Sequence, residues 1–214
     1  GCGLYDKFNT ISDMRRFQFL TGARLLPLSL GDAPVSDISA LADLTSLTML
    51  SLWKTRVLDV TPLASLTRLT CLSLAETQVY DVTPLKHLRK LLELNLEDSR
   101  VFDEPPLADL TVLQFLFLAE SNLHDVSPLA QNTALACLEL SGTAVSDAQA
   151  LTRLLALQYL FLDRTPIADA PPLASLNSLR PPPIYSSRII DIAPYANLTK
   201  MAVLDVTTTA VCDL

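Results

Sequence analysis

Residues 69–90 read LTCLSLAETQVYDVTPLKHLRK, and this stretch decides the fold because the chain repeats its pattern every 22 residues. Leucines occupy the first, fourth and sixth places, and Val79, Asp81 and a Thr-Pro-Leu step follow them. The second leucine of the pattern recurs at the same register at Leu28, Leu50, Leu72, Leu94, Leu116, Leu138, Leu160 and Leu204. In the eighth copy, Pro182 replaces it. A fixed period of this length indicates a repeat architecture.

Each copy predicts a short strand, then a turn, then a short helical segment. Leu72 and Leu74 lie two residues apart, which is the spacing of side chains on one face of a strand. We expect Thr83 to accept hydrogen bonds from the first free amides of the helical segment, and Pro84 to fill its first position. An Asp column precedes this step: Asp37, Asp59, Asp81, Asp103, Asp125, Asp147, Asp169, Asp191 and Asp213. We assign it to hydrogen bonding at the turn and helix start, because calcium requires clustered oxygens.

A single unit cannot fold alone, because its few apolar side chains do not offset the conformational entropy lost on ordering 22 residues. Neighbouring units must therefore stack, bury one another's leucines and pair their strands, which produces a solenoid. An ordinary doubly wound sheet would need longer crossovers and a glycine-rich turn, and the chain has only five glycines.

The unit Leu-x-x-Leu-x-Leu-x-x-Thr-x-Val-x-Asp-x-x-Pro-Leu-x-x-Leu resembles the leucine-rich-repeat family over Leu25–Leu214. Its length and its Asp-x-x-Pro-Leu step are similar to the internalin-type subclass and to the repeats of a eukaryotic protein-phosphatase regulatory subunit. The resemblance implies an α/β fold. This is a curved right-handed solenoid with a parallel β-sheet on its concave face and short α or 3-10 helices on its convex face.

One column departs from the family pattern, which places Asn five residues after the first strand leucine. This chain has hydroxyl side chains there instead, among them Thr55, Thr77, Ser99, Ser121, Thr143 and Thr165. A hydroxyl offers one donor and two acceptors, so we expect a poorer hydrogen-bond ladder to the backbone of the adjoining turn.

The repeats occupy residues 25–214, about nine units, and we expect residues 1–24 to form an N-terminal helical cap. Leu4, Phe8 and Ile11 lie at helical spacing there, and a solenoid needs a cover over its terminal core. The eighth unit is irregular at Pro181–Pro183, whose prolines cannot donate to a strand ladder. The ninth stops before its helical part, so the sequence leaves open a blunt cap or a fragment of a longer chain.

Composition excludes several classes of function. No run of 18 apolar residues is present, which argues against a membrane-spanning helix. The net charge of −7 argues against nucleic acid or an anionic lipid surface as the main partner. Four separated cysteines and two histidines give no metal-ligand spacing, and we expect no metal and no cofactor.

The positions of the cysteines indicate the cellular compartment in which the protein is expected. Cys71 and Cys137 lie three strands apart, about 14 Å at the spacing of strands in a sheet, which is beyond the reach of a disulfide. Cys2 and Cys212 belong to opposite ends. We therefore expect free thiols and favour the cytoplasm, with a bacterial cell-surface protein or lipoprotein, suggested by Gly1-Cys2-Gly3, as the alternative.

We expect binding on the concave face, where strand residues between the leucines point outward. Aromatic side chains ringed by charges are typical of protein interfaces. Glu93, Glu97, Asp98, Glu120 and Glu139 form an acidic stripe, whereas Arg164, Arg180 and Arg188 make the far end basic. The candidate binding residues are Trp53, Arg56, Glu76, Glu93, Glu97, Phe115, Phe117, Glu139, Tyr159, Phe161 and Arg164.

These features favour a protein-interaction module whose partner has a basic and partly apolar surface. The alternative is a targeting domain of a larger bacterial surface protein or effector enzyme, with its catalytic part outside this chain. We expect that the chain is not an enzyme and has no catalytic residues, because no histidine lies on the predicted strands to pair with a Cys or Ser nucleophile.

Overall fold

The computed structural model describes residues 27–102, 105–168, 173 and 175–180, in which strands and short 3-10 helices alternate. The strands are β1 (Pro27–Ser29), β2 (Met49–Ser51), β3 (Cys71–Ser73), β4 (Glu93–Asn95), β5 (Phe115–Phe117), β6 (Cys137–Glu139) and β7 (Tyr159–Phe161). The 3-10 helices are η1 (Ser39–Asp43), η2 (Thr61–Ser65), η3 (Thr83–His87), η4 (Pro105–Asp109), η5 (Ser127–Gln131) and η6 (Gln149–Arg153).

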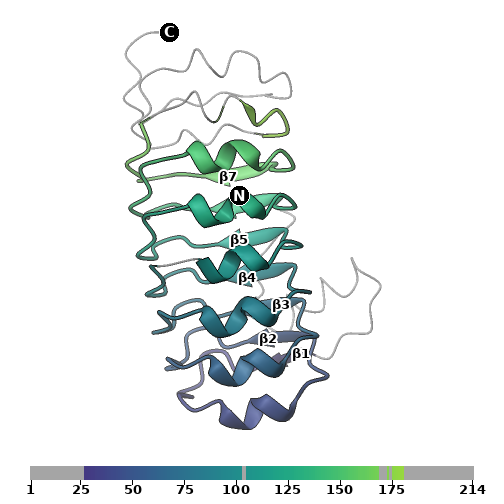
Figure 1. The fold of residues 1–214 in the computed structure, drawn as a ribbon. Helices are drawn as coiled ribbons and strands as arrows, with labels where there is room; N and C mark the ends of the chain where they lie inside the picture. The colour runs from purple at the N-terminus through teal and green to yellow at the C-terminus, as the bar shows by residue number, and fades with distance from the viewer. Residues whose placement is uncertain (1–26, 103–104, 169–172, 174, 181–214) are drawn as a thin grey trace.

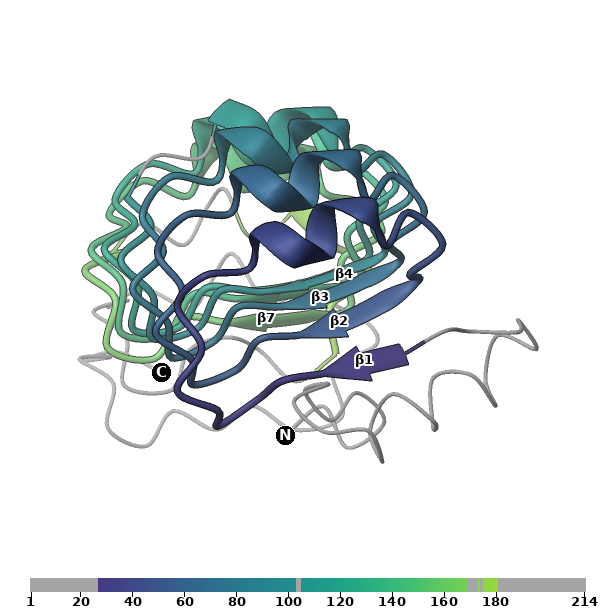
Figure 2. The ribbon, with the colours of Figure 1, turned by 90° about the horizontal axis from the view of Figure 1, so that it is seen from below.

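The strands form one parallel sheet in chain order, and each strand pairs with the next at an offset of 22 residues. Leu72 thus pairs with Leu50 on one side and with Leu94 on the other. The 3-10 helices stack in a second row along one side of this sheet (Figures 1 and 2). The predicted solenoid with a parallel sheet is confirmed, and its helical segments are of the 3-10 type. We call the side of the sheet away from the helices the concave face.

The core lies between the sheet and the row of helices. Leu72, Leu74, Leu85 and Leu88 contribute to it from one unit and are at most 1% exposed. The equivalent leucines of the neighbouring units join the same continuous cluster. Each unit therefore buries its leucines against its neighbours, as the repeat predicts.

The helix starts correct one sequence expectation. It is the carboxylate of Asp81 that accepts the hydrogen bond, from the backbone amide of Thr83 at 2.8 Å. The same contact recurs in the units of Asp37, Asp59, Asp125 and Asp147. Thr83 is the first residue of η3 and Pro84 the second. The prediction that Thr or Ser caps the helix with Pro in its first position was wrong by one residue, and the predicted helix-start role of the Asp column is confirmed at these five positions.

The hydroxyl column bonds the backbone of the turn that follows each strand, as predicted, at six described positions. The Thr77 hydroxyl donates to the carbonyl oxygen of Leu74, three residues earlier in the same unit, at 2.6 Å. The equivalent bonds in other units span 2.5–2.7 Å and come from Thr55, Ser99, Ser121, Thr143 and Thr165. Each hydroxyl thus closes the turn of its own unit.

In each unit from β1 to β7, one residue directly after the strand adopts a left-handed backbone conformation. The φ angles lie between 50° and 60° at six non-glycine positions and reach 71° at Gly142. The column consists of Asp32, Lys54, Glu76, Asp98, Glu120, Gly142 and Arg164. Most of its members are charged, so the strained turn places a row of charges along one edge of the sheet.

Several predictions fall outside the described residues. They are the N-terminal cap at 1–24, the irregular segment Pro181–Pro183, the truncated ninth unit, and Cys2 and Cys212. Among the residues that the structure describes, no helix has the length and apolar character needed to cross a membrane.

Candidate interaction surface

The concave face is formed by the first and third residues of each strand. Their side chains alternate with the core leucines, so they point away from the helices. Five of them gather into a second apolar cluster at the β5–β7 end, separate from the leucine core: Phe115, Phe117, Cys137, Tyr159 and Phe161. The guanidinium carbon of Arg180 lies 6.0 Å from the centre of the Tyr159 ring and borders this cluster.

The direction of these aromatics agrees with the sequence interpretation, but their predicted exposure is wrong in part. Phe115 is 6% exposed and Phe117 is 4% exposed. Tyr159 and Phe161, which lie on the last described strand, are half-buried. Adjacent strands bring the rings together, so each ring shields its neighbour from water.

The charged candidates differ widely in burial. Glu93 is only 3% exposed, whereas Glu97 and Glu139 are half-buried and Arg56 is exposed. Within the acidic stripe, Glu93 is thus buried, and the other members are half-buried or exposed. The sequence pattern gave the direction of these side chains and could not give their burial.

Trp53 and Glu76 come together at the edge of the sheet near β2 and β3. The Trp53 indole Nε1 donates to Glu76 Oε1 at 2.9 Å. The Lys54 ammonium lies 5.5 Å from the centre of the Trp53 ring and 3.3 Å from Asp32 Oδ1. The two partners of the Trp53 side chain, Glu76 and Lys54, thus both belong to the left-handed column.

A second link joins Glu120 and Arg164, whose side chains form a salt bridge across two units. Gly142 lies between them, and a Cβ atom at Gly142 would come within 2.5 Å of the Glu120 carboxyl group. The absence of a side chain at this position lets Glu120 reach over the intervening unit. The acidic stripe and the basic end therefore meet, which the sequence did not predict.

The two described cysteines lie on the concave face as free thiols, as predicted. Burial, together with the charge of Glu93, raises the pKa of the Cys71 thiol. Such a thiol is a poor nucleophile, because the thiolate is the reactive form. His87 lies in η3 and His124 in an exposed loop, so neither belongs to a strand. No group of three or more His, Cys, Asp or Glu side chains gathers as a metal site within the described ranges.

Comparison with known proteins gives solved structures only, since no protein-family model and no curated protein matches the sequence. An internalin of Listeria monocytogenes shares 31% identity over 95% of this chain, with a TM-score of 0.82. Internalin C2 of the same bacterium shares 30% identity over 91% of this chain and 82% of its own, with a TM-score of 0.79. The chain belongs to the leucine-rich-repeat family. Its repeats are internalin-like.

Two more distant leucine-rich-repeat structures share the fold at 19% identity. One is a Leptospira interrogans protein, with a TM-score of 0.81 over 96% of this chain and 54% of its own. The other is the ectodomain of an Arabidopsis thaliana membrane receptor kinase in complex with Casparian strip integrity factor 2, with a TM-score of 0.70 over 82% of this chain and 23% of its own. The present chain spans 58% of the first internalin.

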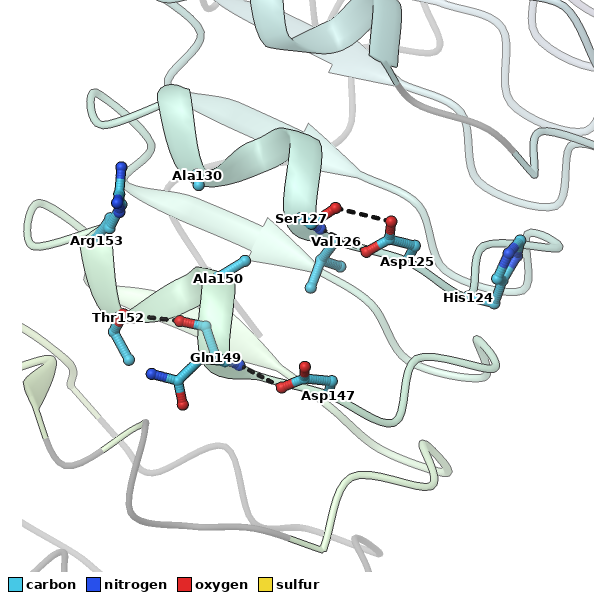
Figure 3. A pocket seen from close by; sticks show the side chains of 10 residues that line it. All are labelled: His124, Asp125, Val126, Ser127, Ala130, Asp147, Gln149, Ala150, Thr152 and Arg153. Carbon is cyan, nitrogen blue, oxygen red and sulfur yellow. Dashed lines mark hydrogen bonds between the residues drawn. The ribbon is translucent and has the colours of Figure 1, made fainter.

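The helical side of this leucine-rich-repeat chain also has a hollow of about 620 Å³ between η5 and η6 (Figure 3). Ala150, which takes the place of Pro128 of the preceding unit, lies in its lining. Asp125 and Asp147 border the hollow and are engaged in helix-start bonds to Ser127 and Gln149.

Proposed function

We propose that this chain is a protein-binding module that receives its partner on the concave face. The observation that carries the proposal is the aromatic cluster at the β5–β7 end, which lies on the side of the sheet that the leucine core does not use. Tyr159 and Phe161 remain half-buried there and offer apolar surface to a partner. Clustered aromatics bordered by charges are the usual anchors of protein interfaces.

Charge defines the chemistry of the partner. Glu97 and Glu139 are half-buried on this face, and Glu120 is exposed at its edge. A partner with basic and apolar side chains would fit both the carboxylates and the rings. The plant receptor ectodomain of the same fold, crystallised with Casparian strip integrity factor 2, supports a binding role for such a solenoid.

A targeting domain within a larger surface protein or effector remains the second candidate. The longer internalin relative, of which this chain spans 58%, favours it. In that case the concave face would serve the same binding role, and any catalytic activity would reside in another part of the protein.

The test is affinity capture of partners with the native chain and with two matched double variants. Tyr159→Ala with Phe161→Ala removes the half-buried rings of the concave face. Phe102→Ala with Leu155→Ala removes two apolar side chains of similar size that are 49% and 62% exposed outside the strands. We expect the first variant to lose the captured proteins and the second to keep them. Retention by the first and loss by the second would refute the concave face as the docking surface.

A further inference from the structure

An exposed apolar stripe runs along the side of the solenoid, where each unit passes from its strand to its 3-10 helix (Figure 2). It consists of Leu58, Tyr80 and Phe102, which are 50%, 50% and 49% exposed and occupy the same repeat position in three consecutive units. The other large apolar side chains that are exposed among the described residues have three different repeat positions: Leu44, Val112 and Leu155. Single exposed apolar residues are ordinary, whereas contiguous ones mark an interaction site.

The backbone holds the side chains of the stripe beside one another. The Gln78 amide donates to the Val57 carbonyl at 3.3 Å, and the Arg100 amide donates to the Val79 carbonyl at 2.9 Å. These bonds join consecutive units directly before the stripe residues, so neighbouring members of the stripe are about 4.8 Å apart, as strands in a sheet are. Because about half of each side chain is exposed, the stripe offers roughly 300 Å² of surface to a partner.

The two flanks of the stripe carry opposite charges. Arg56 and Arg100 stand two residues before the stripe position, on the side of the strands. Asp59 and Asp81 stand one residue after it, on the side of the helices, where their carboxylates accept hydrogen bonds from the helix-start amides. All four side chains are exposed. The salt bridges among the described residues involve other side chains, so both flanks can pair with charges of a partner.

We propose that the stripe is the contact between two copies of this chain, which are related by a two-fold axis that runs along the stripe. Rotation by a half-turn about this axis brings each stripe residue onto its own counterpart and exchanges the two flanks. Tyr80 then packs on Tyr80 of the second copy, as aromatic pairs do. The arginine flank of each copy faces the aspartate flank of the other, with Arg56 opposite Asp59. An axis across the stripe would instead place arginine on arginine.

A second copy fits these flanks better than an unrelated partner does. A surface with an apolar centre and opposite charges on its two sides is complementary to itself, so one symmetric contact satisfies both flanks at once. The net charge of −7 opposes the approach of two copies, and the local pairing of Arg56 with Asp59 offsets that repulsion. The stripe is smaller than the roughly 800 Å² per partner of a stable interface, so we expect reversible association.

Sedimentation equilibrium of the full chain over a rising series of concentrations tests the proposal. We expect the native chain to show a monomer–dimer equilibrium. Tyr80→Glu places two like charges on each other across the axis and should raise the dimer dissociation constant at least about tenfold. Leu155→Glu, just after η6, gives the same net charge at an exposed apolar position of the helical side and should have little effect. A native chain that stays monomeric, or equal effects of the two changes, would overturn the proposal.

Charge reversal tests the two flanks. Arg56→Asp with Arg100→Asp makes both flanks acidic, so each flank then faces a like charge, and the dissociation constant should again rise at least about tenfold. Arg89→Asp with Arg153→Asp makes the same change in net charge on the helical side and should change the dissociation constant far less. Equal dissociation constants for these two variants would contradict the pairing of arginine with aspartate.

A mixture of two reversed variants tests the symmetry. Asp59→Arg with Asp81→Arg makes both flanks basic, so this variant alone should stay monomeric. Its mixture with the acidic variant should associate, because each acidic flank then faces a basic one. Circular dichroism checks that the basic variant folds, since it lacks two helix-start acceptors; if it does not, the acidic variant and its control decide. Folded variants that do not associate when mixed would overturn the two-fold arrangement. The concave face takes no part in these measurements, so their failure leaves the capture experiment standing.

Discussion

At the scale of single residues, a buried hydroxyl sets the turn after each strand. Thr77 is 1% exposed and donates to the Leu74 carbonyl at 2.6 Å. We expect Thr77→Val to destabilise the protein by about 1–3 kcal/mol, because a buried carbonyl loses its donor. Thr77→Ser keeps the hydroxyl, as Ser99 and Ser121 do, and should cost clearly less. Urea denaturation followed by circular dichroism gives both values, and equal midpoints for the two variants would contradict the assigned role.

The left-handed column gives a second prediction at this scale. Asp98 has a φ of 50°, where a Cβ atom is disfavoured by roughly 1–2 kcal/mol relative to glycine. Asp98→Gly and Asp98→Ala remove the same carboxylate, so their difference isolates the backbone. We expect the glycine variant to be more stable by about 1 kcal/mol after the entropy cost of glycine in the unfolded chain is included. Thermal unfolding of the pair measures the difference, and an alanine variant of equal or higher stability would contradict it.

For single residues, the sequence could predict the face of the sheet on which a side chain lies but not the contacts that the side chain makes. The alternation of strand side chains predicted the correct face for Phe115, yet its burial depends on the side chains that cluster with it. Asn132 replaces a leucine of the repeat, and its Nδ2 donates to the carbonyls of Leu107 and Leu110 in the preceding unit at 2.9 Å. No periodicity reveals such contacts, because they depend on the geometry between two units.

At the scale of the elements, the Asp column makes the stability of the helix starts depend on pH. Hydrogen bonds from Thr61 and Thr83 lower the pKa of Asp59 and Asp81 below the ordinary value of 3.8, and those from Ser127 lower that of Asp125. Because the folded pKa is below the unfolded one, the stabilisation is full above about pH 4 and is lost as pH falls through the folded values. Burial raises the pKa of Asp163, so that residue contributes in the opposite sense.

We therefore expect the thermal midpoint to fall steeply as the solution is acidified below pH 4. In a triple variant with Asp59→Asn, Asp81→Asn and Asp125→Asn, the amide oxygen can still accept from the helix amide but does not titrate. This variant should lose part of its stability at pH 7 and show a flatter acid limb. Asp43→Asn, at the end of η1, is the matched control and should retain the native slope. If the thermal midpoint of the triple variant falls below pH 4 as steeply as that of the native chain, the Asp column does not cause the pH dependence.

At the scale of the whole molecule, the 22-residue period made the fold predictable, since one local pattern determines both the unit and its neighbours. Strand order, parallel pairing and the offset of 22 residues all follow from the leucines stacking in one core. The burial of the concave face did not follow, because it depends on how the side chains of neighbouring strands pack together. The hollow between η5 and η6 did not follow either, because it lies between two stacked units.

Because each unit packs mainly against its two neighbours, the cost of a core defect should depend on its place in the row. Leu94 on β4 is 0% exposed and has a stacked unit on each side, whereas Leu28 is only partly buried on β1, the first described strand. We expect Leu94→Ala to cost about 2–5 kcal/mol and Leu28→Ala less than half as much, since the end can relax and already contacts water. Leu94→Ala should also broaden the denaturation curve, because it weakens both interfaces of a central unit and partly uncouples the two halves. Denaturant titration of the two variants measures both effects, and equal costs at the two sites would mean that the first unit is sealed as tightly as the centre.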